Sequence, residues 1–289
     1  MNRFTEKAYA KINLSLDVTG TRPDGYHEMR MIMQSVDLCD DVKISLTQTG
    51  EIRIRTNFRF LPSDGRNIAV KAARAFFDAV GEKKAGADIT LKKRIPVCAG
   101  LGGGSSDAAA VLRALNFMTG AKLPPERLEE LGAGLGSDVP FCVRGGTQLA
   151  EGRGEKLKAL PKLPDCAVVI CKPSFSVSTP ELFRRVDSRR GHNHPDTEGM
   201  IASIEHGELR GVTQRLYNVF EDVPGRHRSA AAEIKSRLLD LGAMGTVMSG
   251  TGPSVFGVFE DFEQAERTRK VLSQRWRDCF AARPAAPAL

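Results

Sequence analysis

Alternating apolar and polar residues predict a strand near the N-terminus. Over residues 8–16, one side of the chain carries Ala8, Ala10, Ile12, Leu14 and Leu16, and the other carries Tyr9, Lys11, Asn13 and Ser15. This period of two is typical of a half-buried strand. Residues 22–25 contain proline and Asp-Gly, which favour a turn. Further strand patterns over residues 29–38 and 42–55 then predict an antiparallel meander.

Helical patterns follow in the first half of the chain. Apolar residues recur every three or four positions over residues 67–80, and Gly81 is a typical helix terminator. A strand is expected over residues 87–95, followed by a glycine-rich segment and a helix over about residues 106–118. Pro124-Pro125-Glu126 is typical of the start of another helix, because proline is tolerated in the first turn.

Composition shifts near residues 152–164, where Gly, Lys and Pro dominate, and we place a domain boundary there, giving domains of residues 1–158 and 159–289. In the second domain the patterns predict strands over residues 167–171, 246–248 and 254–259 and helices over residues 229–241 and 262–276. This order favours a small α+β sandwich. Residues 185–199 are polar and predict a surface loop, and the tail from residue 281 is expected to fray.

Charge and cysteine usage narrow the function classes. The 289 residues carry a formal net charge of +7, but the basic residues are scattered and aromatic residues make up only 6%, which disfavours a nucleic-acid binder. Phosphate-rich small molecules account for the charge equally well. The six cysteines contain no Cys-x-x-Cys pair, and no apolar run approaches the roughly 20 residues that span a bilayer. We therefore expect a cytoplasmic protein with reduced thiols and no membrane partner.

The glycine-rich segment predicts an anion site. It joins a predicted strand to a predicted helix and reads Pro96, Val97, Cys98, Ala99, Gly100, Leu101, Gly102, Gly103, Gly104, Ser105, Ser106. Glycines let the backbone approach a ligand closely, and the free N–H groups of a following helix attract phosphate. The two serines can cap the helix or bind phosphate and metal-bound water. The segment lacks the lysine of a Walker loop and does not fit G-x-G-x-x-G from Gly100.

Three motifs together resemble the GHMP kinases. The second motif of that superfamily is similar to residues 96–110, the first to residues 10–18, and the third to residues 248–256, where Ser249, Gly250, Thr251 and Gly252 would close over the phosphates. Cys98 stands where the family usually has a smaller residue. The resemblance implies an α+β fold of two domains, a ribosomal-protein-S5-like ATP-binding domain followed by a ferredoxin-like α/β sandwich. It also implies ATP, with Mg²⁺ bound to it, as cofactor.

The resemblance implies a catalytic pair, Lys11 and Asp138. Phosphoryl transfer to an alcohol needs an oriented hydroxyl, a group that takes up its proton, and positive charge near the phosphate. By themselves the residues have simpler interpretations, since an Asp after Gly-Ser is often a helix cap and a lysine on a polar strand face is often solvated. How far Asp138 acts as a base rather than orienting the hydroxyl stays open.

Residues 11–14, 22–27 and 136–141 are similar to the branch of the superfamily that phosphorylates a cytidine diphosphate-linked sugar alcohol. That similarity implies an aromatic sandwich for the cytosine, hydrogen bonds at the base edge from His27, and contacts to the sugar alcohol. The implied substrate-binding residues are Asn13, Tyr26, His27, Thr179 and Phe183. For Phe183, an ordinary place in the core remains an alternative. No zinc site is expected, since one close histidine pair without cysteine or acidic neighbours does not make one.

These observations predict an ATP-dependent kinase for a small alcohol, a monomer or weak homodimer that binds no nucleic acid. A GHMP kinase for a mevalonate-type or amino-alcohol acceptor is the nearest alternative. A catalytically inactive nucleotide-binding protein is the alternative from another class.

Overall fold

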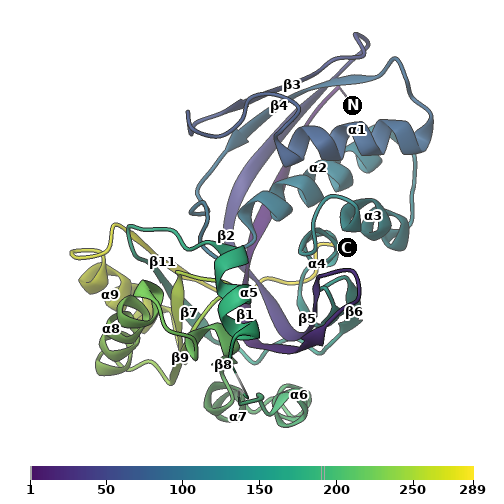
Figure 1. Cartoon of the computed structure of the whole chain (residues 1–289). Coiled ribbons are helices and arrows are strands. Elements are labelled where there is room, and N and C mark those ends of the chain that lie inside the picture. The colour runs from purple at the N-terminus through teal and green to yellow at the C-terminus, as the bar shows by residue number, and fades with distance from the viewer. Residues whose placement is uncertain (1, 190, 192) are drawn as a thin grey trace.

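The computed structural model describes residues 2–189, 191 and 193–289 and shows two layered parts, each built on its own sheet (Figure 1). The strands are β1 (Arg3–Thr21), β2 (His27–Thr47), β3 (Ile52–Thr56), β4 (Gly86–Lys92), β5 (Thr147–Gly152), β6 (Lys156–Ala159), β7 (Ala167–Lys172), β8 (Tyr217–Asn218), β9 (Gly245–Met248), β10 (Val255–Phe259) and β11 (Asp278–Ala282). The helices are α1 (Ile68–Val80), α2 (Gly103–Thr119), α3 (Pro125–Ala133), α4 (Val139–Arg144), α5 (Thr179–Asp187), α6 (Thr197–Glu205), α7 (Leu209–Gln214), the 3-10 turn η1 (Val219–Glu221), α8 (Arg226–Asp240) and α9 (Phe262–Leu272).

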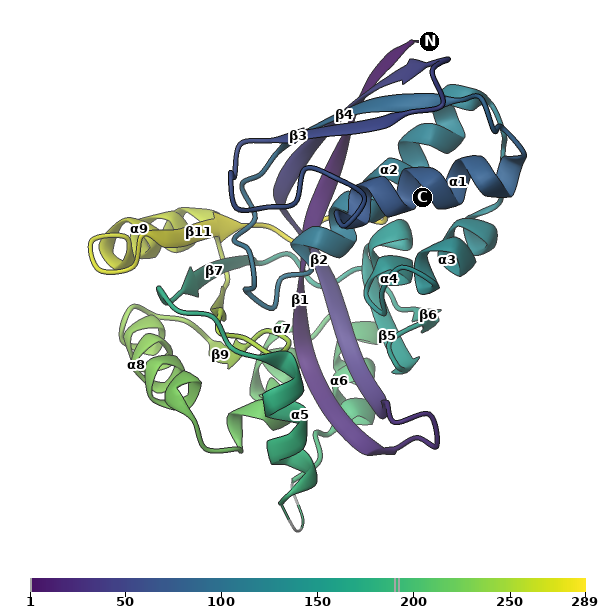
Figure 2. The same ribbon diagram turned by 45° about the horizontal axis from the view of Figure 1, so that its top comes forward.

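The first part is a mixed sheet with helices α1 and α2 packed on one face (Figure 2). Its strands run in the order β3-β4-β2-β1-β8. The edge of β2 that faces away from β1 is shared, because residues 41–47 pair with β4 and residues 29–34 pair with β5. The sheet therefore brings the N-terminal strands, the strand before the glycine-rich segment and the 147–159 hairpin into one layer.

The predicted meander is wrong beyond the first hairpin. Residues 29–38 and part of 42–55 form one continuous strand, β2, which pairs antiparallel with β1 across a register shift near residues 36–39. Strand β3 does not pair with β2 but runs parallel to β4. Helix α1 is the crossover between β3 and β4, and a parallel pair needs such a connection.

The predicted two-sided character of β1 is also only partly right. Its polar side is not solvated, because Lys11, Asn13 and Ser15 are all buried. Its apolar residues do not share one environment, since Ala8 and Leu16 pack in a different core cluster from Ala10, Ile12 and Leu14. Register shifts at residues 9/10 and 13/15 interrupt the regular alternation between these groups.

The ends of α1 and α2 follow from local chemistry. The side chain of Asn67 accepts a hydrogen bond from the Ala69 N–H (3.0 Å), and Gly81 ends α1 in the left-handed conformation, as predicted. Helix α2 begins earlier than predicted, at Gly103, with Gly102 as N-cap and no side-chain cap. The expectation that Ser105 or Ser106 caps this helix is therefore wrong. Gly120 ends α2 as expected.

The second part is an antiparallel sheet in the order β11-β7-β10-β9, packed against α8 and α9 (Figure 1). Two antiparallel neighbours flank β7, with Val255 opposite Cys171 on one side and Cys279 opposite it on the other. The strand order and the helix placement are those of a ferredoxin-like sandwich, which confirms the expected fold. Strand β11 was not predicted, and α9 ends at Leu272, before the predicted residue 276.

Two C-terminal segments return to the first part. Strand β8 pairs with β1, so residues beyond the expected boundary join the first sheet. The tail expected to fray is anchored there by backbone hydrogen bonds, from Asp37 N–H to the Arg283 carbonyl (2.9 Å) and from Ala288 N–H to the Arg144 carbonyl (2.7 Å). Figure 1 accordingly shows the C-terminus beside α4. The composition of the tail gave no sign that its backbone would form hydrogen bonds with β2 and α4.

The predicted loop at residues 185–199 is shorter than expected. Helix α5 extends to Asp187 and α6 begins at Thr197. Positions 190 and 192 of the predicted loop lie outside the described residues. Across the part of the chain that is described, no helix is both long and apolar enough to span a bilayer.

Candidate active site

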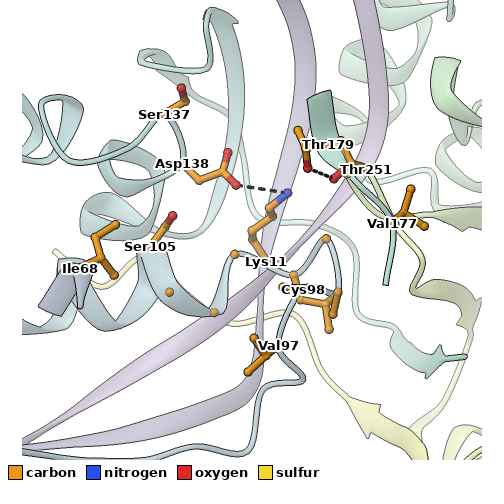
Figure 3. A pocket seen from close by; sticks show the side chains of 18 of the residues that line it. Lys11, Ile68, Val97, Cys98, Ser105, Ser137, Asp138, Val177, Thr179 and Thr251 are labelled. Carbon is orange, nitrogen blue, oxygen red and sulfur yellow. Dashed lines mark hydrogen bonds and ion pairs between the residues drawn. The ribbon is translucent and has the colours of Figure 1, made fainter. Parts of the chain in front are cut away.

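A cavity of about 1030 Å³ lies between the two parts, and nearly all the predicted site residues line it. Its wall combines β1, the turn before β2, the glycine-rich segment, the start of α4, the start of α5 and residues 250–252. Figure 3 shows Lys11 in the centre, Asp138 and Ser105 on one side, and Thr179 and Thr251 on the other. Segments far apart in sequence therefore converge on one space.

The glycine-rich segment forms the floor of the cavity. Residues 96–105 line it, as predicted. The N–H groups of Gly103, Gly104 and Ser105 stand in the first turn of α2, where helix amides have no intrahelical partner, and the helix dipole adds positive potential. This is the geometry of an anion site. Ser106, the last residue of the predicted segment, does not line the cavity, because its hydroxyl turns away and donates to the Tyr9 carbonyl (2.6 Å).

Lys11 and Asp138 face each other across the floor. The Lys11 ammonium lies 3.6 Å from the Asp138 carboxylate and donates to the Asn13 side-chain oxygen (2.7 Å). Only about 5% of the Lys11 side chain is exposed, against 32% for Asp138, so the lysine is fixed while the carboxylate reaches the cavity. Asp138 occupies the N-cap position of α4 but makes no side-chain cap hydrogen bond. The simple cap interpretation therefore does not account for this residue.

The third glycine-rich turn packs directly against the second motif. Buried Ser249 donates its hydroxyl to the Gly100 carbonyl (2.9 Å) and accepts the Asn13 N–H (3.3 Å). Gly100 has φ +75°, and a Cβ there would lie 2.0 Å from the Ser249 carbonyl oxygen. Glycine is thus required on both conformational and steric grounds. Gly250, Thr251 and Gly252 line the cavity, and Ser249 lies just beneath it.

Hydroxyls and amides connect the two parts around this turn. Thr179 and Thr251 share a hydrogen bond (2.9 Å), drawn in Figure 3. Asn218 was not predicted, yet its side-chain amide donates to the carbonyls of Met248 (2.7 Å) and Gly250 (2.8 Å). Asn218 lies on β8, so its contact depends on the return of that strand to the first sheet. No local pattern in the sequence marks it.

The substrate-side aromatics are assembled differently from the expected sandwich. His27 stacks on Phe183 with ring centroids 4.4 Å apart, and its Nε2 lies 2.8 Å from the Asp187 carboxylate. That spacing leaves no room for a base between the two rings. Tyr26 stands more than half exposed at the rim, with the Arg153 guanidinium 5.1 Å from its ring centroid. Arg153 and Asp187 were not predicted, since each resembles an ordinary surface charge in the sequence.

Lys93 and Asp107 also line the cavity and were not predicted as site residues. Asp107 lies within the second motif, and Lys93 belongs in the sequence to a short basic cluster. Burial raises the pKa of the Asp107 carboxyl to about 7, because desolvation outweighs its contact with Lys93. Among the described residues, no group of three or more His, Cys, Asp or Glu side chains could hold a metal ion.

Two family models match the chain. The description "GHMP kinases N terminal domain" matches residues 67–146, and "GHMP kinases C terminal" matches residues 200–278. The first range includes the glycine-rich segment and Asp138, and the second includes the third glycine-rich turn.

Curated relatives match nearly the full length. A 4-diphosphocytidyl-2-C-methyl-D-erythritol kinase of Bacillus subtilis (strain 168) is 48% identical over 265 residues, covering 92% of this chain and 91% of the relative. A protein of the same name from Clostridium novyi (strain NT) is 42% identical over 277 residues, covering 96% of this chain and 98% of the relative.

Solved structures agree with the architecture. A crystal structure of 4-(cytidine 5'-diphospho)-2C-methyl-D-erythritol kinase superimposes with a TM-score of 0.82 at 33% identity, covering 98% of this chain and all of the other. A homoserine kinase from Cytophaga hutchinsonii superimposes with a TM-score of 0.78 at 19% identity, covering 99% of this chain and 96% of the other. The second likeness shows a common fold.

Proposed function

The chain belongs to the 4-diphosphocytidyl-2-C-methyl-D-erythritol kinase family of the GHMP kinases, and from this membership we propose a function for its cavity. The protein transfers the γ-phosphate of ATP to the 2-hydroxyl of 4-diphosphocytidyl-2-C-methyl-D-erythritol, giving the 2-phosphate and ADP. This reaction belongs to the non-mevalonate route to isoprenoid precursors. The observation that supports this assignment most strongly is the pair of Lys11 and Asp138 facing the first turn of α2 across one cavity.

ATP is proposed to lie along residues 96–105, with its phosphates on the free N–H groups of Gly103, Gly104 and Ser105. Helix N-termini bind phosphate well, because unpaired amides and the helix dipole act together. The absence of a Walker lysine from the glycine-rich segment is consistent with this arrangement, since Lys11 on β1 supplies a cation to the same cavity. Ser106 has no direct part in it, because its hydroxyl is used by β1.

Mg²⁺ is proposed to enter with ATP. The described side chains offer no cage of three acidic or histidine ligands, which fits an ion held by phosphate oxygens and water rather than by a protein site. When bound, the ion would neutralise charge on the triphosphate. The protein's own contribution is to hold the phosphates on the amides of α2 and to keep Lys11 fixed beside them.

Lys11 and Asp138 are proposed to have different roles at the acceptor hydroxyl. Asp138 is proposed to orient the attacking hydroxyl and take up its proton as transfer proceeds, since its carboxylate reaches the cavity without being used as a cap. Lys11 is proposed to pair with that carboxylate and to contact the reacting oxygens. Asn13 orients Lys11 through its side-chain oxygen, so it acts partly through the lysine as well as on the sugar alcohol.

The cytidine end is proposed to bind near Tyr26, His27 and Phe183. Because His27 covers one face of Phe183 and the Phe220 ring packs against it with centroids 5.0 Å apart, a base can enter between His27 and Phe183 only if the imidazole moves. Thr179 lies between this end and Thr251, where it can contact the diphosphate. We also propose that the protein is a monomer or weak homodimer that acts on a small molecule in the cytoplasm.

The direct test is ADP release with Mg²⁺-ATP and 4-diphosphocytidyl-2-C-methyl-D-erythritol, compared with mevalonate and homoserine as acceptors. We expect turnover with the first acceptor alone. A folded, ATP-binding protein that turns over mevalonate or homoserine instead would overturn the substrate assignment. One that binds ATP and phosphorylates none of the three would favour the inactive nucleotide-binding alternative.

Phe183→Ala is expected to weaken the cytidine end selectively. Loss of a stacking ring should raise KM for the cytidine substrate roughly tenfold, since base–aromatic stacking contributes about 1–3 kcal/mol. KM for ATP should stay near its original value, because the glycine-rich floor is untouched. Steady-state kinetics with each substrate varied in turn provides the measurement.

Phe117→Ala is the matched control for that variant, because Phe117 is an exposed ring on α2 that contacts Phe4. It should leave both KM values unchanged. Equal changes in the two KM values for Phe183→Ala would show that Phe183 is a core residue and not part of the cytidine site.

A further inference from the structure

A buried charged cluster lies directly beneath the proposed phosphate site. The Lys93 ammonium donates to a carboxylate oxygen of Asp40, to Asp107 Oδ2 (2.6 Å) and to the Gly103 carbonyl (3.2 Å). These three acceptors use all three donors of the ammonium. The three side chains are each at most 6% exposed. Lys93 therefore connects two carboxylates to the first residue of the α2 helix that faces the phosphates.

The two carboxylates are not equivalent. Asp40 Oδ1 accepts the backbone N–H groups of Arg94 and Ile95, and its Oδ2 accepts Lys93. Asp107 Oδ2 accepts Lys93, while Asp107 Oδ1 is buried without a hydrogen-bond partner among the described residues. Several N–H donors stabilise a carboxylate anion, and an unpaired buried oxygen destabilises it. If one of the two carries a proton, it is Asp107.

Among the described residues, Lys93 is the cation in direct contact with Asp107. The other titratable groups around Asp107 are Asp40 from β2 and the Cys142 thiol from α4, and Lys11 from β1 and Arg113 from α2 lie near the same thiol. From α1, the neighbour at this turn is apolar, since Ile68 lies against Gly104. The pKa of the Asp107 carboxyl is accordingly raised to about 7, mainly by burial, with a contribution from the charge of Asp40. The pKa of the buried Cys142 thiol is raised to about 12, so it stays neutral.

We propose that Asp107 is a proton-linked positioning residue, whose carboxylate takes up a proton from solvent when nucleotide phosphates bind to the first turn of α2. This rests on the proposed ATP site. Asp107 lies one helical turn beyond Gly103, so phosphate charge arriving at that turn disfavours its ionised form. Protonation leaves the charge of Lys93 balanced by Asp40 alone. The positive potential beneath the phosphates then increases without any new contact.

The sign of the pH dependence follows by linkage. Because binding takes up a proton, nucleotide affinity should fall as pH rises above about 7, by at most about tenfold per pH unit. Below about pH 6 Asp107 is already protonated in the free protein, and this contribution to the pH dependence disappears. Uptake should increase as pH rises through the range in which Asp107 ionises in the free protein, and it cannot exceed one proton per nucleotide.

The experiment is calorimetric titration of the intact protein with Mg²⁺-ADP at pH 7 and pH 8, in phosphate and in Tris buffer. The difference in heat between buffers gives the protons taken up. The asparagine of Asp107→Asn keeps an oxygen that can accept a hydrogen bond from Lys93, but this side chain cannot titrate. Protons exchanged by the nucleotide itself are the same for both proteins and cancel when the two are compared. The wild type should take up more protons than this variant, and the difference should be larger at pH 8 than at pH 7. The matched control, Asp165→Asn, changes an exposed aspartate paired with Lys162 and should behave as wild type.

Equal proton uptake by wild type and Asp107→Asn would overturn the inference while leaving the proposed function intact. Absence of nucleotide binding by the folded wild type would remove the proposed ATP site, and this inference with it. Folding is monitored independently through thermal unfolding at pH 5 and pH 8. The raised pKa of Asp107 contributes stability that is lost as pH rises through about 7. The unfolding temperature of Asp107→Asn relative to that of the wild type should therefore increase from pH 5 to pH 8. A pH-independent difference between the two would contradict the raised pKa.

Discussion

Asp138→Asn should lower kcat by about 10²–10⁴-fold while leaving KM for both substrates nearly unchanged. The amide preserves shape but cannot take the hydroxyl proton, and general-base contributions of this kind have about that size. Because the Asp138 side chain makes no cap hydrogen bond to α4, its replacement should not weaken the helix. Steady-state ADP release and thermal unfolding of the same preparation are the two measurements.

Lys11→Met separates the two roles at this centre. It removes the ion pair with Asp138 and the donor to Asn13, so kcat should fall as well. If Asp138→Asn retains more than a tenth of wild-type kcat, Asp138 mainly orients the hydroxyl and the proton leaves by another route. A large loss of thermal stability in Asp138→Asn would instead show that Asp138 has a structural role.

Gly100→Ala should raise KM for ATP about tenfold or more and lower the unfolding temperature. The residue has φ +75°, which costs an alanine about 1–2 kcal/mol, and its new Cβ would lie 2.0 Å from the Ser249 carbonyl oxygen. That overlap cannot be relieved by rotating a side chain, because the obstacle is backbone. The second and third glycine-rich turns must therefore separate.

Gly120→Ala is the matched control, since Gly120 has φ +68° and a methyl group added there would meet nothing within 4 Å. It carries the same conformational cost at the far end of α2 without the overlap. It should lower stability modestly and leave KM for ATP unchanged. Similar kinetics for the two alanine variants would show that contact between the two turns is not needed for nucleotide binding.

Local sequence chemistry predicted several elements correctly. Asn67 and Gly81 bound α1, Gly120 ends α2, and Pro125 begins α3, as their side chains and backbone preferences required. The glycine-rich segment was correctly placed between a strand and a helix. These features depend on residues within one or two turns of each other, so one sequence is enough to specify them.

Pairing between distant segments was predicted less well. Strand β3 resembles a meander strand, but the crossover through α1 makes it a parallel neighbour of β4. Lys11 lies on a polar strand face that suggested solvent, yet other segments bury it. The tail resembles a fraying end until the free backbone groups of β2 and α4 are known. In each case the partner lies far away in the chain, where local patterning carries no information.

One sequence was enough to identify the kinase family and the residues of its motifs, because glycines, a lysine and an aspartate at those positions resemble few other proteins. How these residues work together depends on the folded structure. It brought Ser249 onto Gly100, placed Lys11 beside Asp138, and covered one face of Phe183 with His27. It also buried Asp107 with one oxygen unpaired among the described residues. Burial and approach between distant segments set these properties, and both arise only when the two parts of the molecule pack together.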